Sequence, residues 1–178
     1  MSNMSKLWKL KEKVPQEIIE KFPELDELTL QLLYNRGLTT EQGVEAFLAP
    51  EYENQHDPFI FTDMTMACER IWQAIFNQEK ICVYSDYDAD AVTANAVLQQ
   101  TFKYLGVDID SYIPDRFTEG YGLNIEAFEK IKERGAKVVI TVDCGTNSVD
   151  VADYCRENNI DLIITDHHEI TAETPNSF

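Results

Sequence analysis

The chain has 178 residues, of which 44% are hydrophobic, so it can bury one sizeable core, or one domain with a helical appendage. Fifteen Lys and Arg residues against thirty-two Asp and Glu residues give a formal net charge of −17, which argues against a surface that binds nucleic acid mainly by broad electrostatic attraction. No run of about 18 uncharged apolar residues occurs, and residues 1–15 lack the apolar core of a signal peptide, so we expect a cytoplasmic protein with no membrane role.

The first part of the chain has apolar residues at helical spacing. This spacing occurs in residues 15–22, 25–37, 39–50 and 62–78. Gly37 is placed to end the second of these helices, and Thr39 or Thr40 to begin the third. Residues 51–61 lack periodicity, so we expect a connecting loop there. The sequence therefore predicts an all-helical segment over residues 1–78.

From about residue 79 the pattern changes to short β-rich runs that alternate with helical stretches. The expected strands are residues 80–85, 108–114, 136–142 and 160–166. The expected helices between them are residues 91–106, 124–135 and 148–159. Near-continuous apolar strands separated by amphipathic helices indicate buried parallel strands. We therefore expect an α/β fold over residues 79–178, with a mostly parallel sheet flanked by helices.

Three of the four expected strands run directly into acidic or imidazole side chains. These residues are Asp86, Asp88 and Asp90 after the first strand, Asp143 after the third, and Asp166, His167 and His168 after the fourth. A single aspartate at a strand end is commonly a turn former or a helix cap. The carboxyl ends of parallel strands meet at one edge of the sheet, however, and no Lys or Arg at these strand ends balances the charge. Divalent metal is the simplest source of the missing positive charge.

The types of ligand narrow the choice of metal. Carboxylate oxygens with one or two imidazoles suit Mn²⁺ or Mg²⁺, whereas zinc prefers more nitrogen or sulfur. Two such ions about 3.5–4 Å apart activate water and hold the attacking and leaving oxygens of a phosphoryl transfer. The pattern predicts phosphoester hydrolysis, with manganese as the first choice.

Four motifs also resemble those of a known family. They are "DYDAD" at residues 86–90, "YIPDRFTEGYGLN" at 112–124, "VVITVDCG" at 138–145 and "LIITDHHE" at 162–169. Together they resemble the DHH phosphoesterase superfamily, and "RFTEGYGLN" resembles specifically its RecJ family of single-strand-specific exonucleases. The likeness extends upstream through residues 32–50 and 57–75, so it covers nearly the whole chain.

The resemblance implies a metal-dependent exonuclease that removes nucleotides from the 5′ end of single-stranded DNA in recombination and repair. It implies two Mn²⁺ or Mg²⁺ ions in the complete domain, and a single-strand-binding protein or a helicase as a partner. It places Asp88 and Asp90 on the first metal-binding motif, with Asp86 as a further candidate ligand. Asp143 matches the bridging aspartate of the second motif.

The same resemblance makes His167 a metal ligand and His168 the group that touches the scissile phosphate. Asp166 is either a member of the catalytic group or a carboxylate that only orients the histidines. Arg116 is the candidate for a phosphate-contacting cation, with a structural ion pair as the alternative. Tyr121 could stack on a base or cover the core, and both interpretations are open at this point.

Three departures from the family pattern concern the first motif and the length of the chain. Ser85 and Ala91 replace the glycines that flank this motif in the RecJ family, and an alanine would be strained if its backbone had a positive φ. The chain ends soon after His168, so we expect the fourth-motif ligand to lie beyond it. We therefore expect a fragment of a longer protein, or a natural truncation, with little nuclease activity by itself.

Three alternatives come from other functional classes. Residues 88–92 satisfy the D-x-D-x-[T/V] pattern of haloacid-dehalogenase-like phosphatases, although that interpretation leaves the D-H-H motif unexplained. A non-catalytic scaffold of replication or repair with a DHH fold is a second alternative. A phosphodiesterase for short oligonucleotides or cyclic dinucleotides is the third, and the helical N-terminal part disfavours it.

Overall fold

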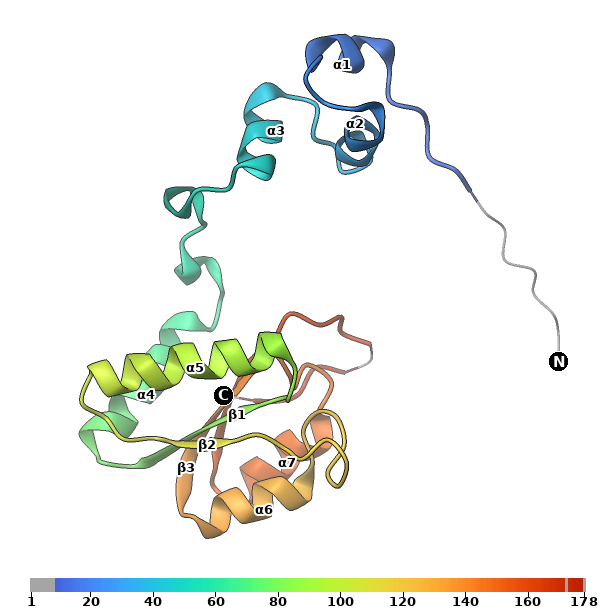
Figure 1. Ribbon diagram of the computed structural model, residues 1–178. Coiled ribbons are helices and arrows are strands. Elements are labelled where there is room, and N and C mark those ends of the chain that lie inside the picture. Colours follow the sequence, from blue (N-terminus) through green and yellow to red (C-terminus); the bar gives the residue numbers. More distant parts are fainter. Residues whose placement is uncertain (1–8, 172, 178) are drawn as a thin grey trace, which may run out of the picture. The chain divides into compact units, whose positions relative to one another are not determined.

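The computed structural model describes residues 9–171 and 173–177 (Figure 1). Its internal contacts divide the chain into two compact units, of which the first ends at Asp57 and the second begins at Pro58. In the described part of the chain, no helix has the length and apolar character needed to cross a bilayer. The first eight residues, on which part of the signal-peptide expectation rests, lie outside the described residues.

The first unit is helical. It consists of α1 (Gln16–Lys21), α2 (Glu27–Tyr34), α3 (Glu41–Leu48) and the 3₁₀ turn η1 (Tyr52–Asn54). The Asp26 side chain accepts a hydrogen bond from the Thr29 amide and begins α2, and the Thr40 hydroxyl accepts one from the Gly43 amide and begins α3. A small core holds these helices together, and its buried members are Val14, Phe22, Leu30, Leu33 and Val44.

The second unit contains the sheet. Its strands are β1 (Lys80–Ser85), β2 (Asp110–Tyr112), β3 (Ala136–Val142) and β4 (Asp161–Thr165). All neighbouring strands are parallel, and their order is β2-β1-β3-β4. The turn η2 (Pro58–Ile60) begins this unit, and its helices are α4 (Met64–Phe76), α5 (Ala89–Tyr104), α6 (Ile125–Glu133) and α7 (Val149–Glu157).

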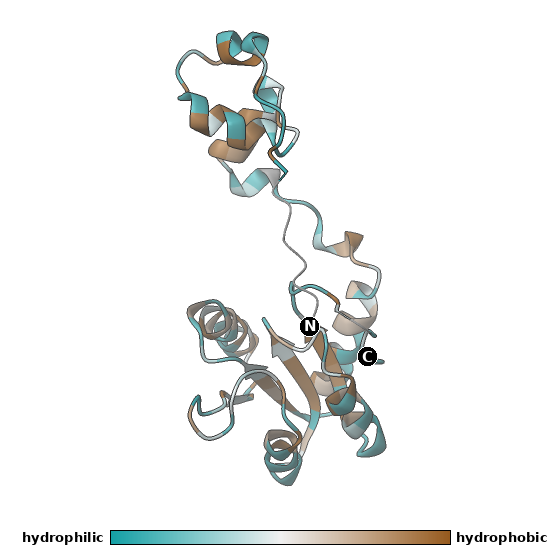
Figure 2. Cartoon of the chain, turned by 90° about the vertical axis from the view of Figure 1, so that its right-hand side faces the viewer, coloured by the Kyte–Doolittle hydropathy of each residue, from teal (hydrophilic) through white to brown (hydrophobic). Residues whose placement is uncertain are grey.

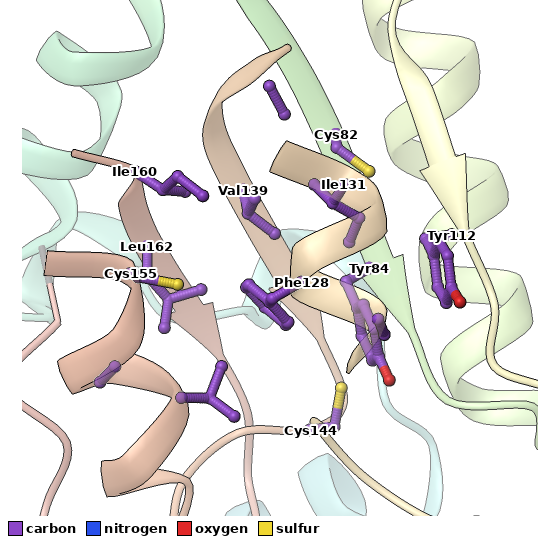
Figure 3. Packing of buried hydrophobic residues seen from close by; sticks show 14 residues of the cluster. Cys82, Tyr84, Tyr112, Phe128, Ile131, Val139, Cys144, Cys155, Ile160 and Leu162 are labelled. Carbon is purple, nitrogen blue, oxygen red and sulfur yellow. The ribbon is translucent and has the colours of Figure 1, made fainter. Parts of the chain in front are cut away.

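Helices cover both faces of this sheet. α4 and α5 lie on one face, and α6 and α7 lie on the other (Figure 1). Ile81 belongs to the buried cluster that includes Phe102 of α5, whereas its neighbour Cys82 belongs to the cluster that includes Phe128 of α6 (Figure 3). The strands are hydrophobic along most of their length (Figure 2) because both faces are buried. The expected α/β fold with a helical segment before it is confirmed.

The structure differs from the sequence-based expectations at element ends. β2 covers only Asp110–Tyr112, because Pro114 cannot donate to a strand ladder. α5 begins two residues before its expected start, because the Asp88 side chain accepts a hydrogen bond from the Ala91 amide and caps the helix. Helix α4 lies in the same compact unit as the sheet. The domain boundary near residue 78 stays a prediction.

A buried arginine joins α4 to the amino-terminal edge of the sheet. Arg70 is only 9% exposed; its Nε donates to Asp161 Oδ2 and its Nη2 donates to Glu79 Oε2, each at 2.6 Å. Asp161 begins β4, and Glu79 directly precedes β1. The hydrogen bond from Arg70 lowers the pKa of Glu79, because it stabilises the carboxylate more than burial disfavours it.

We predict that Phe128→Ala lowers the free energy of unfolding by about 3–5 kcal/mol, because the ring is fully buried beneath the sheet and its removal leaves a cavity. Phe117→Ala is the control: this ring is 93% exposed, so the change should stay within about 0.5 kcal/mol. Urea unfolding followed by circular dichroism measures both values. Equal stabilities of the two variants would contradict the packing described here.

We predict that Arg70→Met lowers the free energy of unfolding by about 2 kcal/mol at neutral pH, because two partly buried carboxylates lose a charged donor. The ionised Glu79 adds stability above its usual pKa of 4.5, and this stability is lost as the pH falls through its lower pKa in the folded chain. The difference between wild type and variant should therefore shrink in acid. Urea unfolding on both sides of that pH measures it.

The control for this experiment is Arg156→Met. Arg156 pairs with Asp153 at 2.7 Å, but both side chains are about half exposed, so the loss should be less than about 1 kcal/mol. If the Arg70→Met difference were the same in neutral and acidic solution, Glu79 would not be the group that depends on Arg70.

Candidate metal centre

The register of the sheet brings three aspartates to one level. Ser85 at the end of β1 pairs with Val142 at the end of β3, which pairs with Thr165 at the end of β4. The next residues along the three strands are Asp86, Asp143 and Asp166. They therefore follow adjacent strands at the carboxyl edge, where open α/β sheets bind ligands.

Asp143 and the two histidines form a compact group of possible metal ligands. One donor atom from each of Asp143, His167 and His168 lies within 4.8 Å of the others. His167 Nε2 is 3.1 Å from Asp143 Oδ1. The histidines are adjacent in the sequence, and their rings meet edge to face with centroids 5.0 Å apart. Residues from two separate strand ends thus supply one carboxylate and two imidazoles to the same place.

The backbone after β3 is shaped to present Asp143. Asp143 has a φ of 59°, a left-handed conformation that is uncommon outside glycine but that Asp tolerates. Gly145 follows with a φ of 118°, and a Cβ built there would lie 3.2 Å from both Ile164 Cγ2 and Thr141 Oγ1. A side chain at position 145 would therefore be strained and crowded. The short turn from β3 to α7 depends on this glycine.

Asp166 orients the histidine loop. Its Oδ1 accepts hydrogen bonds from the His167 amide at 2.7 Å and the His168 amide at 3.2 Å, and it lies 2.6 Å from His168 Nδ1. Its Oδ2 accepts a hydrogen bond from the Thr146 amide at 2.8 Å. Burial disfavours the charge on Asp166, but the hydrogen bonds from Thr146 and His168 outweigh it and lower the pKa.

The contact with Asp166 also determines which ring nitrogen of His168 is available. Because Nδ1 faces the carboxylate, Nε2 points away from it and lies 3.5 Å from the Tyr121 hydroxyl. The hydrogen bond with Asp166 raises the pKa of His168, and the charge of Asp166 adds to this effect. Carboxylates that fix a histidine in this way are typical neighbours of metal and phosphate sites.

The first motif contributes three aspartates in different environments. Asp86 is 1% exposed, and its Oδ1 accepts a hydrogen bond from the Tyr87 amide. Its Oδ2 is buried with no hydrogen-bond partner among the residues that the structure describes. Asp88 and Asp90 are exposed, and Asp88 caps α5. Neither belongs to the three-donor group of Asp143, His167 and His168.

The charges around Asp143 fit a cation. Burial raises the pKa of Asp143, and the negative charges of Asp90 and Asp88 raise it further. No described residue donates a hydrogen bond to the buried Asp86 Oδ2, and a bound cation would satisfy this oxygen. Carboxylate oxygens together with imidazole nitrogens are ligands that suit Mn²⁺ or Mg²⁺. The residues present therefore fit a divalent metal.

The structure accommodates Ser85 and Ala91, which replace the glycines that flank the first motif in the RecJ family. Ala91 lies inside helix α5, so its backbone is helical and is not strained by the methyl group. It is fully buried, and its amide donates to Asp88 Oδ1. Ser85 is also buried, and its hydroxyl accepts a hydrogen bond from Asn95 Nδ2 at 2.9 Å. Both residues are accommodated without a positive φ.

Arg116 and Tyr121 lie in the loop between β2 and α6 and meet a third residue. The Arg116 guanidinium is 5.2 Å from the centre of the Tyr87 ring, and Tyr121 meets the same ring edge to face with centroids 6.4 Å apart. Tyr121 is 63% exposed, so it does not cover the core. Within the described residues Arg116 forms no ion pair with a carboxylate. Sequence reasoning missed Tyr87, although its place inside "DYDAD" could have indicated a role.

Comparison with protein-family models assigns the sheet-containing part to a family. Residues 80–177 match the model of the DHH family, N-terminal domain. The single-stranded-DNA-specific exonuclease RecJ of Bacillus subtilis is 47% identical over 148 residues, which is 83% of this chain and 19% of that protein. The RecJ of Escherichia coli is 32% identical over 146 residues, which is 82% of this chain and 25% of that protein.

Solved structures give the same result. A crystal structure of an exonuclease RecJ bound to manganese matches with a TM-score of 0.59 and 33% identity, over 63% of this chain and 29% of that one. The RecJ of Thermus thermophilus in complex with Mn²⁺ matches with a TM-score of 0.62 over 91% of this chain and 22% of that one; at 24% identity it shows the fold alone. The chain spans about a fifth to a quarter of the length of these curated relatives. It belongs to the DHH family, and its residues 80–177 match the N-terminal domain of that family.

Proposed function

We propose that this chain contributes the metal-binding part of a phosphodiesterase that removes nucleotides from the 5′ end of single-stranded DNA. The observation that carries the proposal is the convergence of Asp143, His167 and His168 at the carboxyl edge of the sheet. Asp86 follows the adjacent strand β1 at the same level, and its buried Oδ2 has no hydrogen-bond partner among the described residues. Relatives that share the motifs are single-stranded-DNA-specific exonucleases. We also propose a role in recombination and repair, which the resemblance of the motifs implies.

The proposed cofactor is manganese, with magnesium as the alternative. Asp143 and His167 would hold the metal together with Asp88 and Asp90, and Asp86 would be a further ligand. An exonuclease RecJ has been solved with manganese, which favours this metal over magnesium. When bound, two such ions would supply positive charge for the attacking and leaving oxygens of a phosphodiester.

The remaining site residues have proposed roles that follow from their contacts. Asp166 would hold the His168 ring in one orientation, because its Oδ1 faces Nδ1 and its Oδ2 accepts a hydrogen bond from the Thr146 amide. As the imidazolium, His168 would keep Nδ1–H on Asp166 and donate Nε2–H to the scissile phosphate. Asp166 thereby acts through His168.

The loop residues would contact the rest of the DNA. Arg116 would bind a phosphate, since its guanidinium is not neutralised by a carboxylate within the described residues. Tyr121 would stack on a base, with Tyr87 supporting both side chains. A net charge of −17 makes such a local cation necessary for an anionic substrate. A single-strand-binding protein or a helicase as a partner of the whole protein stays a prediction.

The first experiment for this proposal is calorimetric titration with Mn²⁺. Wild-type chain should bind Mn²⁺ more tightly than Mg²⁺, and Asp143→Asn should weaken Mn²⁺ binding by at least about tenfold, because the amide keeps the shape but removes the charge. Asp150→Asn is the matched control, since this exposed aspartate lies in the first turn of α7 outside the site and should leave binding unchanged.

Two outcomes would count against the metal centre. Equal binding by wild type and Asp143→Asn would mean that the ions occupy the acidic surface nonspecifically. No binding by either protein would count against metal binding by this chain, and would be the result expected of a fragment that needs its fourth-motif ligand or of a non-catalytic scaffold. Circular dichroism of both variants confirms that any loss is not due to unfolding.

The second experiment measures turnover of 5′-labelled single-stranded DNA in the presence of Mn²⁺. We predict little or no nuclease activity from these 178 residues, because the chain spans only about a fifth of the length of the Bacillus subtilis relative. A longer protein that contains this chain should cut the same DNA. Turnover by the 178-residue chain at a rate similar to that of the longer protein would contradict the prediction.

A further inference from the structure

The loop of residues 113–124 is attached to the core through two tyrosine hydroxyls. Tyr84 of β1 and Tyr112 of β2 are buried and stacked, with ring centroids 5.6 Å apart and planes 8° from parallel (Figure 3). The Tyr84 hydroxyl donates to the Gly122 carbonyl at 2.8 Å, near the end of the loop. The Tyr112 hydroxyl donates to the Glu119 carboxylate in its middle. The rings belong to the core, and their polar ends hold the loop.

Glu119 is the centre of this attachment. Its Oε1 accepts hydrogen bonds from the Tyr112 hydroxyl and from Lys130 Nζ of α6, the latter at 2.8 Å. Its Oε2 accepts a hydrogen bond from the Asp115 amide at 2.8 Å. The hydrogen bond from Lys130, followed by that from Tyr112, lowers the pKa of Glu119 to about 2, so the carboxylate is ionised at neutral pH. One carboxylate therefore joins β2, α6 and the start of the loop.

Residues 115–119 form a short turn that begins at Asp115. Asp115 Oδ1 accepts hydrogen bonds from the Phe117 amide at 2.9 Å and the Thr118 amide at 3.0 Å. The Glu119 amide donates back to the Asp115 carbonyl at 2.9 Å. Hydrogen bonds of Asp115 and Glu119 thus hold both ends of the turn together, and Arg116 lies between these two residues in the sequence. Phe117 is 93% exposed, so side-chain packing does not hold this turn in place.

We propose that Glu119 is a positioning residue that fixes the turn at residues 115–119, so that Arg116 lies over Tyr87 beside the metal centre. This inference rests on the proposed function, because Arg116 needs a substrate phosphate to act on. Without Glu119, the turn would keep its internal hydrogen bonds but lose its anchors to β2 and α6. Arg116 would then sample many positions and bind phosphate more weakly.

The test compares Glu119→Gln with Glu129→Gln. Glu129 is exposed on α6, so its substitution removes the same charge without touching the loop anchor. Hydrogen exchange of the Asp115 amide should be about tenfold faster in Glu119→Gln and unchanged in Glu129→Gln, because only the first loses the ionised acceptor. Tyr112→Phe, which keeps the ring and removes only the hydroxyl, should also speed this exchange.

The second measurement is binding of a 5′-phosphorylated phosphorothioate oligothymidylate in the presence of Mn²⁺. Glu119→Gln should weaken this binding by about tenfold while leaving the affinity for Mn²⁺ itself within about twofold of wild type. A role in overall stability alone would instead lower both affinities through unfolding. Thermal unfolding of each variant provides the check on folding.

The outcomes separate this inference from the proposed function. Equal exchange of the Asp115 amide in wild type and Glu119→Gln overturns the positioning role. Faster exchange with unchanged oligonucleotide affinity also overturns it, because Glu119 would then order the loop without affecting how Arg116 binds phosphate. If the wild-type chain bound Mn²⁺ but no oligonucleotide, the proposed function would fail, whereas faster exchange in the variant would still support the anchoring of the loop.

Discussion

The parallel register of β1, β3 and β4 is the constraint on which the site depends. Each strand is buried on both faces, so a slip by one residue would exchange the residues that face the two helical layers. The same register places Asp86, Asp143 and Asp166 at one level where the strands end. Burial of apolar side chains therefore decides where the carboxylates lie, although none of that apolar surface belongs to the site.

Crowded carboxylates at this edge are stabilised by different means. Asp166 has backbone amides and His168 around it, so its charge is compensated within the chain. Asp143 has His167 beside it, but burial, followed by the charges of Asp90 and Asp88, opposes its ionisation and raises its pKa. Asp86 keeps one buried oxygen with no donor within the described residues. Asp166, whose charge is compensated, is suited to orient His168, whereas Asp143 and Asp86 are suited to bind a cation.

Most of the secondary structure could be predicted because its signals are local. Apolar spacing, the cap at Thr40 and the glycine after α2 depend on neighbours within a few residues, and the structure confirms these elements. The ends of β2 and α5 were less well predicted, because Pro114 and the Asp88 cap compete with the periodicity. The aspartates and histidines of the candidate site were identified because they directly follow strands, and strand ends are visible in the sequence.

The sequence by itself determined the order of helices and strands, the α/β class and the residue types gathered at the carboxyl edge, because each of these follows from spacing along the chain. Only the tertiary structure decided that Asp166 faces His168 Nδ1, that Tyr87 lies under Arg116, and that Glu119 joins β2 to α6. These contacts depend on loop conformations and side-chain directions across separate elements. No local spacing encodes them, since they arise when the packed layers bring distant segments together.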